Sequence, residues 1–136
     1  MSALTTDRRT PERSGDRRDL PVKGATKIYA GSLVAVNASD LLVPMATATG
    51  LRGIGRAEER VDNSTGADGD QTCKTGAGIY RFNNSPAADL ITLADIGKPC
   101  YGVDDQTVAL TDGTGTRSVA GNIFDVDAQG VWVDFR

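Results

Sequence analysis

The acidic residues near the end of the chain resemble the start of a calcium-binding loop. Asp125 and Asp127 occupy the first and third positions of such a loop, and Gly130 occupies the sixth. A calcium loop also needs a bidentate Glu at its twelfth position, where this chain has Arg136. The flanking runs "NIFDV" and "VWVDF" have the pattern of strands. We therefore interpret residues 127–130 as a tight hairpin turn that ends in glycine, without a metal.

A second acidic loop, "VDNSTGADGDQ", contains Asp62, Asp68 and Asp70 among glycines. Carboxylates and backbone carbonyls are the oxygen ligands that calcium prefers. The spacing of these three carboxylates matches no diagnostic ligand pattern, so a solvated acidic loop is the simpler interpretation. We expect this protein to hold neither a metal nor a cofactor.

Residues suited to catalysis are scarce in this sequence. It contains no histidine, the commonest general base and metal ligand. We expect Cys73 and Cys100 to be reduced packing residues, and the adjacent Asp104 and Asp105 to form a turn. The runs "GLRGIG" and "GAGIYR" lack the dinucleotide-binding fingerprint and open no helix. The sequence therefore predicts a protein that is not an enzyme, with a hydrolase based on carboxylates alone as the minor alternative.

The elements that position these residues have the pattern of strands. From residue 23 onward, short runs rich in β-branched residues alternate with turns, and 16 glycines punctuate the chain. No amphipathic helical pattern of useful length occurs. We expect one all-β domain over residues 20–136, an antiparallel β-sandwich that is jelly-roll-like, with about eight strands. One short helical turn is expected near Thr92, with Gly97 as its stop.

The alternation of apolar residues within these runs predicts which side chains point into the core. The expected inward set is Ile28, Leu33, Val36, Ile79, Phe82, Leu93, Ile96, Val103, Val108, Leu110, Phe124, Val126, Val131, Val133 and Phe135.

Residues 1–19 differ in composition from the rest of the chain. They combine four acidic side chains with five arginines and have one sizeable apolar side chain, Leu4. Such a segment buries too little surface to offset the entropy cost of ordering it. We expect a flexible charged N-terminal arm, which is either a passive tail or a segment that orders on a partner. In the second case the residues that bind the partner or a neighbouring subunit are Arg8, Arg9, Arg13, Arg17 and Arg18.

Two classes of partner are disfavoured by the charge and hydropathy pattern. The net charge is -3 and no basic stripe is present, so we expect no nucleic-acid binding. No apolar run approaches the ~20 residues that cross a bilayer, and the first residues lack the apolar core of a secretory signal. We expect no membrane contact.

Several runs together resemble the small decoration (cement) proteins of tailed-bacteriophage capsids. They are "GRAE", "GIYRFNNS", "ADIGKPCYGVDDQTV" and "VDAQGVWV", at residues 55–58, 78–85, 94–108 and 126–133. The resemblance covers approximately residues 22–136, and its specificity lies in the order and spacing of the runs. The charged N-terminal segment matches no part of the family pattern.

The resemblance implies a structural protein that binds the outer surface of a capsid and stabilises the shell by clamping neighbouring subunits. Its partners would be the major capsid protein and other copies of itself. It would be made in the cytoplasm of the host bacterium and would reside on the outside of the virion. Reciprocal exchange of the arm favours a dimer over a trimer. The alternative is a carbohydrate- or receptor-binding β module, for which the supply of aromatic side chains is small.

Overall fold

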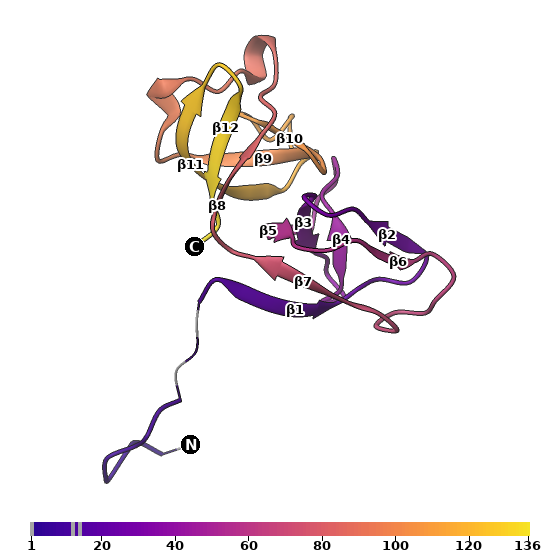
Figure 1. The fold of residues 1–136 in the computed structure, drawn as a ribbon. Helices are drawn as coiled ribbons and strands as arrows, with labels where there is room; N and C mark the ends of the chain where they lie inside the picture. Colours follow the sequence, from indigo (N-terminus) through magenta and orange to yellow (C-terminus); the bar gives the residue numbers. More distant parts are fainter. Residues whose placement is uncertain (1, 12, 14) are drawn as a thin grey trace.

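The computed structural model describes residues 2–11, 13 and 15–136. The chain is all-β, with twelve strands in antiparallel sheets and two short 3-10 helices among the described residues. Each large sheet is formed from one half of the chain, the first by strands between residues 17 and 76 and the second by strands between residues 79 and 134 (Figure 1).

The first sheet has five strands in the order β1-β7-β5-β3-β4. A separate ladder of two strands, β2 and β6, lies beside it (Figure 1). The bounds of these strands are β1 Arg17–Pro21, β2 Thr26–Ile28, β3 Leu33–Val36, β4 Leu42–Pro44, β5 Arg52–Ala57, β6 Val61–Asn63 and β7 Thr72–Gly76.

The second sheet also has five strands, in the order β10-β9-β11-β12-β8. The two 3-10 helices, η1 and η2, lie between its strands β8 and β9 in the sequence. The bounds are β8 Ile79–Phe82, η1 Ala87–Asp89, η2 Leu93–Asp95, β9 Pro99–Asp104, β10 Thr107–Ala109, β11 Val119–Asp127 and β12 Gly130–Asp134.

The hairpin predicted at the end of the chain is confirmed. Asp127 and Gly130 form the closing pair of β11 and β12, so Ala128 and Gln129 make the loop. Gly130 has a φ of 155°, and a Cβ there would overlap the carbonyl oxygen of Phe82 on the neighbouring strand β8. Glycine is required at this position by both the backbone conformation and the close approach of β8.

Strand β3 contributes to two separate hydrophobic clusters. Leu33 and Ala35 belong to a cluster with Met45 and with Ile123 and other residues of the second half of the chain. Val34 points the other way and belongs to a cluster formed within the first half, together with residues such as Val22, Ile28 and Leu42. Alternate side chains of a strand point to opposite faces. The unbroken apolar run "LVAV" therefore reflects a strand that is buried on both faces.

Of the fifteen predicted inward residues, six are buried, six are partly buried and three are exposed. Leu93, Ile96 and Phe124 are 65%, 48% and 51% exposed. The register of β11 against β12 shifts between Ile123 and Asp125, so Phe124 is the extra residue of a bulge and faces solvent. Leu93 and Ile96 lie in and just after η2, where a strand-like alternation does not apply. The buried members are Ile28, Leu33, Phe82, Val108, Val131 and Val133, and the remaining six are partly buried.

The boundary predicted at residue 19 falls inside a strand. Residues 17–19 belong to β1, which pairs along its length with β7, and Leu20 packs against the cluster formed by the first half of the chain. The described residues before β1 are all exposed, and this segment extends away from the body of the molecule (Figure 1). The helical turn expected near Thr92 is confirmed as η2, which Thr92 precedes as its N-cap.

Candidate functional site

The five arginines predicted to bind a partner lie in two structural settings. Arg8, Arg9 and Arg13 are exposed residues of the extended segment before β1. The Arg8 guanidinium donates a hydrogen bond to the hydroxyl of Thr10, 3.0 Å away. Arg17 and Arg18 lie on β1 and are fixed to the first sheet by its pairing with β7.

Arg17 already has a carboxylate partner in its own chain. Its Nη1 lies 3.2 Å from Oε2 of Glu58, which follows β5. Arg56 binds both oxygens of the same carboxylate, and its guanidinium lies 4.0 Å from the centre of the Tyr80 ring. Glu58 therefore connects β1, β5 and, through Tyr80, strand β8 of the second sheet. Arg17 therefore belongs to a group of charged and aromatic side chains near the junction of the two halves.

A basic hollow forms where the N-terminal segment meets the first sheet. It has a volume of about 410 Å³ and is lined by Arg13, Arg17, Arg18, Asp19 and Lys74. Lys74 lies directly across from Asp19 in the β1–β7 ladder. Sequence reasoning missed Lys74, because its place in this hollow depends on a strand pairing between distant parts of the chain.

The carboxylate of Asp127 accepts hydrogen bonds from its own hairpin. Oδ2 accepts from the indole N–H of Trp132 at 2.9 Å, and Oδ1 accepts from the backbone N–H groups of Gln129 and Gly130. These donors, Trp132 above all, hold the pKa of Asp127 below its ordinary value. The arrangement fits the predicted role of the residue in forming the turn.

The acidic loop of residues 61–71 uses its carboxylates in the same way. Asp62 accepts hydrogen bonds from the hydroxyl and the backbone N–H of Ser64, which lower its pKa. Asp68 accepts from the N–H of Gly24 at 2.8 Å, and Asp70 accepts from the N–H of Ala67 at 2.8 Å. Within the described residues, no three acidic or cysteine side chains come together as a set of metal ligands.

The two cysteines are free and buried, as predicted. Cys73 lies in the cluster of the first half and Cys100 in the other cluster. Burial raises the pKa of each thiol to about 11, so neither is a reactive thiolate near neutral pH. The pair Asp104 and Asp105 lies at the β9–β10 turn, where Asp104 accepts a hydrogen bond from the N–H of Gln106.

Trp132 is a poor platform for a sugar ring. The Arg81 guanidinium lies 5.6 Å from the centre of its ring, and the same guanidinium donates a 2.8 Å hydrogen bond to Gln129. Its indole N–H is used by Asp127. A sugar that stacks on an aromatic ring needs an uncovered face of that ring. Here the Arg81 guanidinium, held by Gln129, covers a face of Trp132.

An exposed apolar surface lies over η1, η2 and β11, and sequence reasoning missed it. We call the apolar surface the set Leu90, Leu93, Ile96 and Phe124, which are 46%, 65%, 48% and 51% exposed. The segments that carry Ile96 and Phe124 lie side by side because two backbone hydrogen bonds join them. The N–H of Gly97 donates to the carbonyl of Ile123, and the N–H of Ile123 donates to the carbonyl of Lys98. The sequence did contain a signal, because Leu90, Leu93 and Ile96 recur at every third position of "LITLADI".

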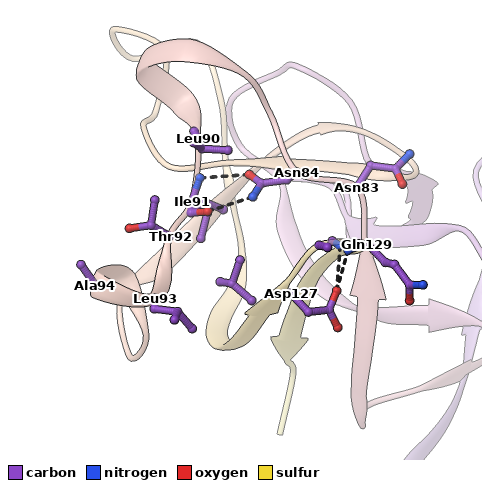
Figure 2. A pocket seen from close by; sticks show the side chains of 12 residues that line it. Asn83, Asn84, Leu90, Ile91, Thr92, Leu93, Ala94, Asp127 and Gln129 are labelled. Atoms are coloured by element: carbon purple, nitrogen blue, oxygen red, sulfur yellow. Dashed lines mark hydrogen bonds between the residues drawn. The ribbon is translucent and has the colours of Figure 1, made fainter.

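A hollow of about 680 Å³ adjoins the apolar surface. Leu90, Leu93 and Val126 are among the residues that line it, with Asp127 and Gln129 at the hairpin turn. Figure 2 shows the segment that carries Leu93 on one side of this hollow and the hairpin turn with Asp127 on the other.

These features define an all-β protein of antiparallel sheets with an exposed charged segment and an exposed apolar surface. No protein-family model, curated protein or solved structure matches the chain. Among the described residues, no helix has the length and apolar character needed to cross a bilayer.

Proposed function

We propose that this protein is a structural decoration protein that binds the outside of a tailed-bacteriophage capsid and stabilises the assembled shell. The observation that carries the proposal is the segment before β1. Its described residues are all exposed, and it projects from a folded β body (Figure 1). A projecting charged segment on a stable body suits a protein that grips a partner surface.

The body of the protein supports the same function. Asp70, Asp104 and Asp127 accept hydrogen bonds within their own turns, and the thiols are buried. A cement protein needs no nucleophile and no cofactor. By binding the assembled shell and not its separated subunits, many copies stabilise the shell through mass action.

The jelly-roll-like arrangement and the role of the arm are part of this proposal. The exposed cations available for capsid contact are Arg8, Arg9, Arg13 and Arg18, since Arg17 has Glu58 as a partner. Single exposed ion pairs contribute only ~0.2–1 kcal/mol. The proposed contact therefore depends on several arginines together, and it weakens as salt screens them.

The test is co-sedimentation of this protein with purified capsids assembled from tailed-phage major capsid proteins. The double variant Arg13→Glu/Arg18→Glu should bind at least tenfold more weakly, about 1.4 kcal/mol. The matched control is Lys27→Glu/Arg60→Glu, which reverses two charges beside Tyr29 on the body and should bind as the native chain does. Failure of the native chain to sediment with capsids would overturn the proposed function.

A further inference from the structure

The apolar surface is held rigidly although it faces solvent. Asn84 donates to the carbonyl of Ile91 at 2.8 Å and accepts from the N–H of the same residue at 3.0 Å. Asp95 accepts from the N–H of Thr92 at 2.9 Å and pairs with Lys98 at 3.2 Å. Polar contacts thus fix the segment that presents Leu90, Leu93 and Ile96 to water. A surface fixed in this way loses little conformational entropy when another chain covers it.

The size of this surface indicates that something covers it. Four large apolar side chains of the second half of the chain are each about half exposed or more. Leu90 and Leu93 line the same hollow, and backbone hydrogen bonds join the segments that carry Ile96 and Phe124. Soluble proteins seldom expose contiguous apolar patches without a binding role. The adjoining hollow of about 680 Å³ has room for side chains of an extended segment (Figure 2).

The charge distribution along the chain indicates that the segment covering the apolar surface carries a positive net charge. Residues 79–136 contain eight acidic and four basic side chains, a net charge of -4. Residues 20–78 are balanced with six of each, and residues 1–19 have five basic and four acidic side chains, a net charge of +1. The N-terminal segment is thus the one part of this chain whose charge complements the half that carries the apolar surface.

The N-terminal segment also has a side chain suited to the hollow. Leu4 is 71% exposed and is followed, four and five residues later, by Arg8 and Arg9. Extended chain advances ~3.3 Å per residue, so Leu4 in the hollow places these arginines ~13–17 Å further along. Asp125 is exposed on β11, two residues from Asp127 in the lining of the hollow, and it is the carboxylate that we assign to these arginines.

The N-terminal segment of a molecule points away from that molecule's own apolar surface, so it does not cover it. It leaves the body at β1 and extends away from the end at which η1 and η2 lie (Figure 1). We propose that residues 2–9 of one copy bind across the apolar surface and the adjoining hollow of a second copy, with Leu4 in the hollow. When two copies exchange segments reciprocally, the assembly closes as a dimer. The interface forms without a capsid, and Arg13 and Arg18, which lie outside residues 2–9, stay available for the proposed capsid contact.

The test is the oligomeric state of the full chain without capsids, measured by sedimentation equilibrium over a dilution series. The native chain should self-associate. Leu4→Asp on the segment and Leu93→Glu on the apolar surface should each raise the midpoint concentration for dissociation at least tenfold. Tyr29→Glu, which changes a side chain 54% exposed on the body, is the matched control and should associate as the native chain does.

A second arm of the experiment identifies which surfaces meet. In the double variant Leu4→Cys/Leu93→Cys, mild oxidation should produce covalent dimers, whereas Leu4→Cys/Tyr29→Cys should remain largely uncoupled. A native chain that is monomeric at every concentration would overturn the proposal. Association that persists after deletion of residues 1–11 would also overturn it, because the apolar surfaces would then be pairing with each other.

Discussion

Phe124 shows how one extra residue in a strand decides which side chains are buried. Its neighbour Ile123 is 2% exposed, whereas Phe124 is 51% exposed. Simple alternation from Val126 predicts the opposite, and the register shift between Ile123 and Asp125 accounts for the difference. A bulge changes the phase of the alternation on one side of it.

The bulge predicts unequal costs for truncating these two neighbours. Phe124→Ala should lower the free energy of unfolding by less than ~1 kcal/mol, as is usual at exposed sites. Ile123→Ala removes fully buried methyl groups and should cost ~2–5 kcal/mol. Urea denaturation at low protein concentration measures both. Equal losses in the two variants would show that Phe124 is buried.

The Asp127 carboxylate predicts a pH-dependent signal from the chain's one tryptophan. Its pKa lies below the ordinary value of 3.8 because Trp132 and the turn donate to the ionised form. A carboxyl whose pKa is lowered by folding stabilises the native state above its unfolded pKa, and this contribution is lost as the pH falls through the folded value. We therefore expect Trp132 fluorescence to change in a step below pH ~3.8, while the protein is still folded.

Two substitutions test this assignment. Asp127→Asn should remove the fluorescence step, because the amide does not titrate. Asp62→Asn alters another carboxyl with a lowered pKa, and its partner Ser64 lies in a different loop, so the step should remain. A step that survives in Asp127→Asn would show that Trp132 senses another group.

At the scale of elements, β1 is part of the folded body rather than of the projecting segment. It pairs with β7 over residues 17–21, Leu20 packs on the cluster of the first half, and Arg17 binds Glu58. The first sheet therefore needs residues whose composition suggests an unstructured arm.

Two truncations separate the segment from the strand. At protein concentrations low enough to keep the chain monomeric, deleting residues 1–11 should leave the melting temperature unchanged, since every described residue removed is exposed. Deleting residues 1–21 removes the partner of β7 and should lower the melting temperature by at least ~5 °C, the shift that roughly one kcal/mol produces at this size. Differential scanning calorimetry measures both. Equal melting temperatures would show that β1 contributes nothing to stability.

The contact between the two sheets depends on a glycine in β5. A Cβ at Gly53 would overlap the backbone of Ala120 in β11. Gly53→Ala should therefore destabilise the protein by ~1–3 kcal/mol, the usual cost of overpacking. Gly15→Ala is the control, because no atom lies within 4 Å of the added methyl group. A Gly53→Ala variant as stable as the native chain would mean that the sheets separate at this point without cost.

At the scale of the whole molecule, folding is expected to be independent of metal ions. The carboxylates of both acidic loops accept hydrogen bonds from nearby backbone groups, as Asp127 does from Gly130 and Asp70 does from Ala67. Neither excess calcium nor a chelator should shift the melting temperature. A shift of more than ~5 °C, corresponding to roughly one kcal/mol, would contradict this expectation and identify a bound ion.

The sequence by itself was sufficient to predict the features that depend on residues close together in the chain. It predicted an all-β chain, the hairpin at residues 127–130 and the turn after Thr92, because glycines and short polar side chains determine local backbone geometry through nearby hydrogen bonds. It also predicted two free buried cysteines, since small apolar thiols are usually packed inside.

Only the tertiary structure decided the features that depend on distant pairing. Residues 17–19 became a strand because β7 lies beside them, and Lys74 joined the basic hollow for the same reason. Phe124 faces solvent because β11 has a bulge relative to β12. Strand β3 contributes to two hydrophobic clusters because other parts of the chain pack against both of its faces. The free energies that select these arrangements come from contacts between residues far apart in the chain, and a local pattern does not contain them.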